Sequence, residues 1–350
     1  MKFIQINIQY SWLINSIMLL PFLGIMLSCT SFVPDDLDSL GDDIVITTKE
    51  FSPYMGRVTT FENTFNVSSK STLPLNFKVM GMRTADGVPA PELLENYPVK
   101  VWTALYTGQE RSLAEINKKR KIEYRPLLEI QAKSGDLTFW NAGSSSLINT
   151  LPMEGYLFDI EVENTGGRRY FRNLALNPKK ERDYEPSQYD DLLGIAKNSY
   201  LRVPLAINLF GERTDMPISD IRMYIFENKE ITAETSSLRF SVLDSLGNAI
   251  DIRKFKETDF ENLIHGFNHR FEDGKVIYDV AYPIPLITYP TRYTNYSGSV
   301  ARANLKFNRI WKGGFRIEAY LLFDFAIFRE GHWEIQIRFN GESPNFENEQ

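Results

Sequence analysis

Residues 315–339 read FRIEAYLLFDFAIFREGHWEIQIRF, and this stretch indicates the fold class of the chain. Hydrophobic and polar side chains alternate from Phe315 to Phe328 and again from Trp333 to Phe339. A period of two is typical of strands that bury one face. The four residues between them, 329–332, indicate a hairpin-like connection. The stretch therefore predicts two long neighbouring strands of a β-rich fold.

The same alternation recurs through the rest of the chain. It is found at residues 73–79, 156–162, 238–242 and 276–282. Residues 244–248, DSLGN, predict a tight turn after the third of these segments. Strands therefore dominate the prediction along the whole chain.

Two short helices are predicted from capping boxes, in which a Ser or Thr is followed three residues later by Glu. The first covers residues 112–119 and begins with Ser112 and Glu115. The second covers residues 258–264, with Gly266 just beyond its end, where glycine commonly stops a helix.

The length of 350 residues favours two domains, since domains cluster near ~100–150 residues. A hydrophobic content of 43% is enough for two full cores. Residues 177–191, NPKKERDYEPSQYDD, combine two prolines with mixed charges and so are typical of a domain boundary. We expect an all-β fold with minor helix: two β-sandwich or jelly-roll-like domains at residues 44–178 and 192–345, joined by a linker at 179–191.

The N-terminus has the features of a lipoprotein signal peptide. Residues 1–28 carry one charge, Lys2, and an apolar run broken by proline and glycine that is too short to span a membrane permanently. Ser28 and Cys29 at its end resemble a bacterial lipobox, in which the cysteine is lipidated and becomes the first residue. More than one acyl chain gives stable anchoring. We therefore expect a chain anchored in a membrane of the cell envelope through Cys29, with the folded part in water.

An acidic tether is predicted at residues 29–43, and its fourteen residues after the cysteine reach at most ~45 Å. Asp35, Asp36 and Asp38 resemble the acidic signal that directs some Bacteroidetes lipoproteins to the outer face of the cell. The alternative interpretation of these aspartates is a solvated linker.

The composition excludes several functional classes. One cysteine and three histidines leave little for a metal site or a thiol nucleophile. A net charge of −6 disfavours duplex nucleic acid as a partner. His265 and His269 are spaced as metal ligands on a helix, but the glycine between them favours a structural or surface role. No nucleophile elbow, phosphate-binding loop or dinucleotide motif occurs, so we predict no catalytic residue, metal ligand or cofactor.

A cluster of tyrosines suggests where a ligand could bind. Tyr289, Tyr293 and Tyr296 lie in a loop-like segment, and Trp311 follows. Such rings pair an apolar face with a polar tip, as sugar recognition requires. The alternative is that these rings only cover the sheet and pack the loop. Two further tyrosines, at 278 and 282, fall in an alternating strand and are predicted to lie in the core or on a face of the sheet.

The chain also resembles a family of Bacteroidetes cell-envelope lipoproteins of unknown function. The resemblance rests on residues 271–275 (FEDGK), 282–285 (YPIP) and 331–335 (GHWEI), which occur in this order. Such lipoproteins are often encoded near glycan uptake pairs of the SusC/SusD type. The resemblance implies an accessory role beside outer-membrane transporter proteins, with a polysaccharide or oligosaccharide as ligand. No catalytic residue is assigned from this resemblance.

Three functions therefore remain open. The first is a non-catalytic surface lipoprotein that binds carbohydrate for a glycan uptake system. The second is a structural, pilin-like or assembly subunit, because such lipoproteins also consist of two β-sandwiches. The third is an envelope hydrolase, for which no motif singles out a pair of carboxylates.

Overall fold

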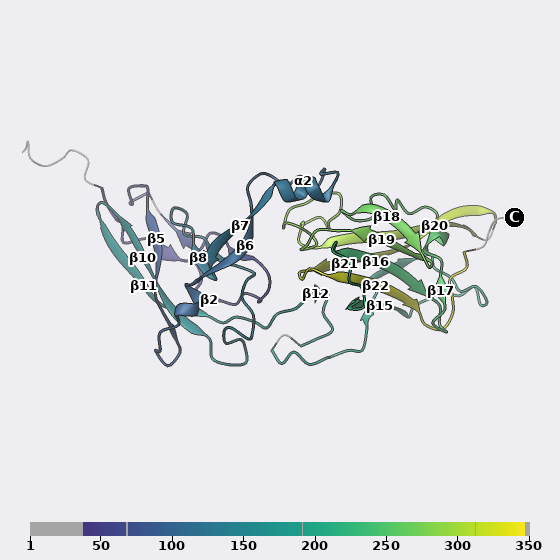
Figure 1. The fold of residues 1–350 in the computed structure, drawn as a ribbon, viewed down its shortest axis with the longest axis horizontal. Helices are drawn as coiled ribbons and strands as arrows, with labels where there is room; N and C mark the ends of the chain where they lie inside the picture. Colours follow the sequence, from purple (N-terminus) through teal and green to yellow (C-terminus); the bar gives the residue numbers. More distant parts are fainter. Residues whose placement is uncertain (1–37, 68, 191, 312, 347–350) are drawn as a thin grey trace, which may run out of the picture.

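Nearly all the regular secondary structure of the described residues is β-strand, which confirms the all-β prediction. The computed structural model describes residues 38–346 except 68, 191 and 312. The predicted signal peptide, Cys29 and the tether up to residue 37 lie outside the described residues. Figure 1 shows an elongated molecule with two bodies side by side, the N-terminal one coloured purple to teal and the C-terminal one green to yellow.

The N-terminal body contains eleven strands, the one α-helix of the described residues and a 3-10 helix. They are β1 (Val45–Ile46), β2 (Glu50–Phe51), β3 (Thr59–Phe61), β4 (Phe65–Asn66), β5 (Asn76–Thr84), η1 (Pro91–Leu93), β6 (Asn96–Trp102), α2 (Leu113–Lys118), β7 (Arg120–Pro126), β8 (Leu128–Ile130), β9 (Leu137–Phe139), β10 (Tyr156–Asn164) and β11 (Gly167–Leu176).

Two sheets enclose the core of this body. The larger has the order β2-β11-β10-β5 and the smaller the order β3-β9-β8, while β1 pairs with β4. Phe77 and Phe158 from the larger sheet and Phe139 from the smaller belong to one buried cluster. The hairpin of β6 and β7 is a separate two-stranded sheet and leads to α2, which Figure 1 shows above the near end of the C-terminal body.

The C-terminal body contains the remaining eleven strands and a second 3-10 helix. They are β12 (Tyr184–Glu185), β13 (Leu201–Arg202), β14 (Leu205–Ile207), β15 (Ile221–Glu227), β16 (Ser237–Leu243), β17 (Ala249–Ile250), η2 (Ile252–Lys254), β18 (Phe267–Glu272), β19 (Lys275–Asp279), β20 (Ala301–Trp311), β21 (Phe315–Ile327) and β22 (His332–Phe339).

A seven-stranded sheet forms one layer of this body, in the order β13-β15-β22-β16-β19-β18 with β17 beside β16. The other layer contains β20 and β21, with β12 and β14 also paired to β21. Phe240 of the first layer lies 6.0 Å from Phe325 of the second, ring centroid to ring centroid. The core of the C-terminal body therefore lies between two sheets.

The predicted hairpin at residues 329–332 is wrong. β21 pairs with β20, whereas β22 lies between β15, to which it is antiparallel, and β16, to which it is parallel. Both edges of β22 are occupied, so β21 cannot pair with it, and residues 329–332 carry the chain from one layer to the other. The predicted turn at 244–248 is confirmed, because β16 and β17 pair antiparallel across it.

The segment predicted as a linker contacts both bodies. The Lys179 amide donates to the Pro53 carbonyl at 2.8 Å, and β12 pairs with β21. Arg57 of the N-terminal body forms a 2.9 Å ion pair with Glu185 and lies 3.8 Å from the centroid of the Phe328 ring. The division into two domains stays a prediction, and the two cores are joined by these contacts.

The described end of the predicted tether packs on the N-terminal body. The Thr72 amide donates to the Ser39 carbonyl at 2.9 Å, and Arg169 Nη1 donates to the Asp42 carbonyl at 2.5 Å. Ile44 follows as a buried core residue. The contacts begin at Ser39, so at most nine residues of the predicted tether, 30–38, are left as a spacer, with a reach of at most ~30 Å rather than ~45 Å.

Candidate functional site

A segment of the N-terminal body packs against the C-terminal body and forms one wall of the candidate site. Tyr106 and Ile116 share a small buried cluster with Ala281 and Leu286. The segment between them turns at Gly108, whose φ of +74° lies in the left-handed region that favours glycine. A Cβ at this position would lie 3.1 Å from the Thr291 side chain. Glycine therefore allows the two bodies to approach closely here.

The predicted helix at 112–119 is confirmed as α2, and its cap fixes this wall. Ser112 Oγ accepts a hydrogen bond from the Glu115 amide at 3.2 Å. Glu115 Oε2 accepts from the Arg111 amide at 2.8 Å, one residue before the cap. Ile116 is the buried residue of the helix and anchors it on the C-terminal body. The capping box therefore sets the position of residues 107–111.

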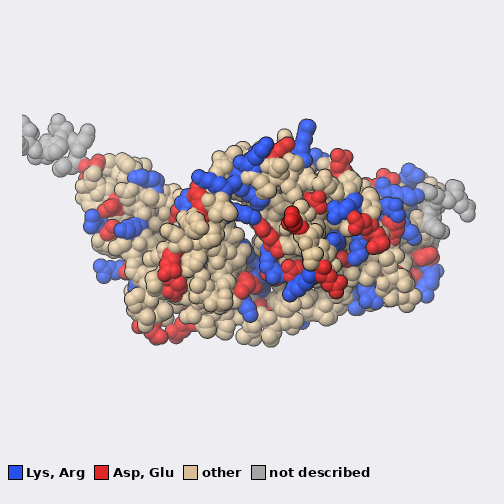
Figure 2. Space-filling model, in the orientation of Figure 1, with Lys and Arg blue, Asp and Glu red and all other residues tan. Residues whose placement is uncertain are grey.

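The cationic run 118–121, at the end of α2, has partners both nearby in sequence and on the C-terminal body. Lys119 Nζ contacts Glu110 Oε1 at 2.5 Å, and Arg120 Nη1 donates to the Tyr282 carbonyl at 3.0 Å. Figure 2 shows Lys and Arg side chains gathered over the junction of α2 and β7, with both charge signs mixed over the rest of the visible face.

The predicted helix at 258–264 is wrong, because these residues form turns. Thr258 Oγ1 accepts from the Lys306 amide of β20 at 2.7 Å, so its hydroxyl is not free to cap a helix. Gly266 serves close packing instead of ending a helix: a Cβ there would lie 2.7 Å from Cβ of Tyr278 in β19. The turns bring His265 toward the segment that precedes α2.

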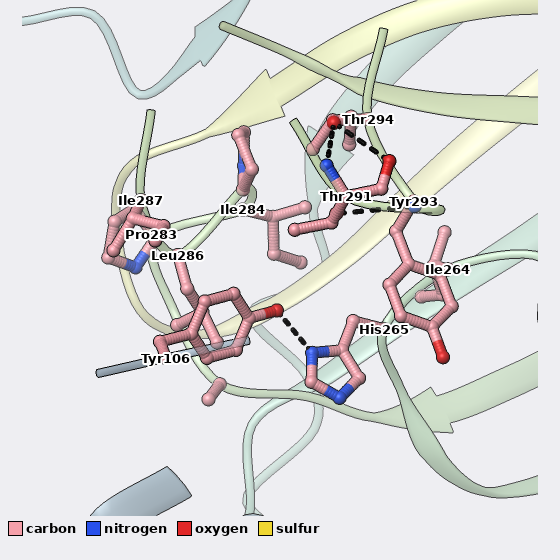
Figure 3. Close-up of a pocket in the computed structure, with 13 residues that line it drawn as sticks. Tyr106, Ile264, His265, Pro283, Ile284, Leu286, Ile287, Thr291, Tyr293 and Thr294 are labelled. Atoms are coloured by element: carbon pink, nitrogen blue, oxygen red, sulfur yellow. Dashed lines mark hydrogen bonds between the residues drawn. The ribbon is translucent and has the colours of Figure 1, made fainter. Parts of the chain in front are cut away.

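His265 joins the two bodies through both ring nitrogens. Its Nε2 lies 2.8 Å from the Glu110 carbonyl oxygen, which can only accept, so Nε2 carries the proton. Its Nδ1 then accepts from the hydroxyl of Tyr106. Figure 3 shows this contact between Tyr106 and His265 beside the ring of Tyr293. Burial lowers the pKa of His265, which favours the neutral ring that this arrangement requires.

Tyr293 stacks on His265 and lines both a small cavity and a larger groove. The two rings are 4.8 Å apart between centroids and inclined by 3°. Beside them lies a small cavity of about 20 Å³, lined mainly by apolar residues around Ile284 and Leu286 (Figure 3). This space holds about one water molecule. In front of them lies an open groove of about 730 Å³.

The groove is the candidate binding site. Three segments far apart in sequence line it, namely residues 108–111, 261–269 and 292–293. They present rings, amides and charged groups: Gln109, Glu110, Arg111, Glu261, Asn262, His265, Phe267, Asn268, His269, Arg292 and Tyr293. Its volume is in the range of small-ligand sites, and its lining is more polar than that of a typical drug-sized pocket.

Glu110 is a structural part of this wall. Its side chain is only 2% exposed, and Oε1 accepts from the Thr107 amide at 3.0 Å as well as from Lys119. Burial raises its pKa, but the hydrogen bonds from Lys119 and Thr107 outweigh burial and hold the pKa at about 2. Glu110 is therefore an ionised carboxylate neutralised by Lys119, and it contributes no net charge to the groove.

The structure separates the residues that the sequence analysis grouped as a ligand site. Tyr293 lines the groove, while Tyr289 and Tyr296 in the same loop are 60% and 97% exposed. Trp311 lies at the far end of β20, ten residues beyond Ala301, which lines the small cavity. At about 3.3 Å per residue the two ends of β20 are roughly 33 Å apart. Trp311 therefore does not share a site with Tyr293.

Tyr278 and Tyr282 belong to the core, as predicted, although Tyr282 lies three residues beyond the end of β19. Both are buried, and their hydroxyls donate to the carbonyls of Phe260 and Ser237. Sequence reasoning missed the wall at residues 108–111, whose only local signals were Gly108 and the capping box that begins at Ser112.

The described residues contain no group of three or more His, Cys, Asp or Glu side chains placed to hold a metal ion. The ring of His269 lies 6.0 Å from that of Tyr278, centroid to centroid. Within residues 38–346, apart from the gaps, no helix is long and apolar enough to cross a membrane.

A family model described as a domain of unknown function, DUF5007, matches residues 66–348. The chain belongs to the DUF5007 family. The match includes most of the N-terminal body, the connecting segment and the C-terminal body, so all three walls of the groove lie within the DUF5007 region. A comparison with curated proteins found no match.

Proposed function

We propose that this DUF5007 chain binds an oligosaccharide in the groove without chemically changing it, as a lipid-anchored accessory protein of a glycan uptake system. The observation that carries the proposal is the lining of the groove, where the rings of Tyr293 and Phe267 lie among the amides of Gln109, Asn262 and Asn268. Sugars offer C–H faces to rings and hydroxyls to amides, which both donate and accept hydrogen bonds.

The exposed tyrosines beside the groove support an extended ligand. Tyr289 and Tyr296 lie in the same loop as Tyr293 and are largely exposed. Exposed aromatic rings next to a groove are a reason to consider binding there, whereas scattered single ones are ordinary. An oligosaccharide that extends from the groove along this loop would meet these rings.

The proposed location rests on the N-terminal sequence. Ser28 and Cys29 supply the lipidation site, and outer-membrane anchoring at the cell surface would place the groove where imported glycans arrive. Residue 39 and those after it pack on the N-terminal body, so the lipid would hold this body near the membrane and leave the groove farther along the molecule, as Figure 1 orients it.

The test is affinity electrophoresis of the full chain in detergent against a broad polysaccharide panel, followed by calorimetry with oligosaccharides. Tyr293→Ala should weaken binding by about three- to tenfold, the range of an aromatic contact. Trp311→Ala is the matched control and should leave the affinity unchanged. If no glycan binds, or if Tyr293→Ala has no effect on a glycan that does bind, the proposal fails. Turnover of any glycan would instead support a hydrolase.

A further inference from the structure

Two arginines of the groove have no carboxylate partner among the described residues. Arg111 lines it from the segment before α2, and Arg292 lines it from the tyrosine loop. Both side chains are exposed. Several other exposed arginines of this chain are paired, as Arg302 is with Asp324 at 2.7 Å and Arg253 with Asp251 at 2.5 Å. On a chain with a net charge of −6, two such guanidinium groups in one groove are a distinctive feature.

The other charged groups of the groove do not cancel the positive charges of Arg111 and Arg292. Glu110 is neutralised by Lys119 at 2.5 Å, and its pKa of about 2 keeps it ionised within that pair. Burial lowers the pKa of His265 and favours the neutral ring, whose Nδ1 accepts from the Tyr106 hydroxyl. Among the described lining residues, Glu261 is the one exposed carboxylate. The lining therefore has an excess of positive charge, supplied by Arg111 and Arg292.

We propose that the groove selects anionic oligosaccharides, with Arg111 and Arg292 binding a carboxylate or sulfate group on the sugar. This inference rests on the proposed function and names its substrate class. A guanidinium group offers a planar fork of donors that matches the oxygens of such groups. Arg111 and Arg292 belong to different walls, so one ligand bound between them would contact both bodies.

The aromatic rings and the arginines of the groove have different roles in recognition. Tyr293 and Phe267 can pack on any sugar ring, whereas the arginines distinguish charged sugars from neutral ones. Arg292 lies 5.4 Å from the centroid of the Tyr293 ring, so the same ligand can meet both side chains. Since the arginines are exposed, salt should screen their contribution more than that of the rings.

The test uses the full chain in detergent and three probes: oligogalacturonate, its methyl ester and a sulfated galactan oligosaccharide. The methyl ester has the same sugar backbone without the charge, and the sulfated probe distinguishes sulfate from carboxylate as the preferred group. We expect at least one anionic probe to bind about tenfold or more tightly than the methyl ester, a difference that one charge-assisted contact provides. We also expect molar salt to reduce that difference.

The variants test which side chains are responsible. Arg111→Ala and Arg292→Ala should each weaken binding of the anionic probe by about tenfold and leave neutral sugars unaffected. Arg111→Lys and Arg292→Lys should recover part of the loss. Glu261→Gln should strengthen anionic binding. Arg172→Ala, an exposed arginine of β11 in the N-terminal body and not part of the groove lining, is the matched control and should change nothing.

The outcomes separate this inference from the proposed function. Equal affinity for charged and neutral sugars, with no effect of the arginine variants but a loss in Tyr293→Ala, overturns the anionic preference and leaves oligosaccharide binding intact. Binding of neutral sugars alone also overturns the preference while supporting oligosaccharide binding. Failure of every probe and of the whole glycan panel overturns both.

Discussion

Replacing Ile116 with alanine should loosen the wall of the groove without unfolding either body. Ile116 is the buried residue of α2, with 0% exposure, and it packs in a small cluster with Tyr106, Ala281 and Leu286. Removing three buried carbons costs ~2.4 kcal/mol in transfer free energy alone. Ile→Ala substitutions in cores cost about 2–5 kcal/mol, and a small cluster near the surface can collapse, so we expect about 2–3 kcal/mol.

This loss should appear as local opening. α2 has only six residues, and a helix of that length is not stable without its packing. A loss of about 2–3 kcal/mol corresponds to roughly 30- to 150-fold more frequent opening. Hydrogen exchange of the α2 amides measures this directly, and trypsin cleavage in the run 118–121 gives an independent readout.

The control is Leu105→Ala, because Leu105 is 77% exposed and precedes the same helix. It should leave exchange of α2 unchanged. Urea unfolding of both bodies should change little in Ile116→Ala, since neither main core includes this residue. Unchanged exchange of the α2 amides in Ile116→Ala would show that this side chain does not hold the wall in place.

Three further predictions concern other parts of the molecule. Burial lowers the folded-state pKa of His265 below its unfolded value of ~6.5, so the unfolded chain takes up the proton first as the pH falls. The free energy of unfolding measured in urea should therefore decrease below pH ~6.5, and it should decrease less in His265→Gln. An equal decrease in that variant would contradict this. Glu334→Ala should lower the free energy of unfolding by about 1–3 kcal/mol in urea titrations, because it removes a buried carboxylate that accepts from Ser241 at 2.6 Å and pairs with the partly exposed Lys275, and unchanged unfolding would count against it. Gly108→Ala should weaken oligosaccharide binding in calorimetry, since its Cβ would meet Thr291 at 3.1 Å in a left-handed backbone conformation; wild-type affinity would show that this close approach is not needed.

Local patterns were sufficient to predict the fold class and one helix. Alternation along 156–162 predicted a strand, and β10 (Tyr156–Asn164) includes it. The capping box at Ser112 predicted α2 because its hydrogen bonds join residues three positions apart. The same box at Thr258 failed, since a contact with Lys306, 48 residues away, uses that hydroxyl. A sequence motif therefore predicts the structure correctly when the hydrogen-bond partners of its residues are also close in sequence.

Strand pairing and the groove depend on contacts between distant residues. Residues 329–332 look like a hairpin, but the edges of β22 are taken by β15 and β16. Tyr293 was predicted as a site residue from its loop, whereas Arg111 belongs to a segment far earlier in the chain and no periodicity relates the two. Trp311 is near the tyrosines in sequence, yet an extended strand carries it away from them. Sequence spacing therefore could not show that Arg111 lines the groove together with Tyr293, or that Trp311 lies away from it.

Hydrogen exchange mass spectrometry with the tightest-binding oligosaccharide of the panel is the decisive experiment on whether a ligand binds between the two bodies. The full chain is compared with and without a saturating amount of this ligand. We expect protection at residues 106–111, 261–269 and 289–296, which form the groove and its rim, and no change around Trp311. Protection confined to one body, or centred on the far end of β20, would mean that the ligand does not bind in the groove.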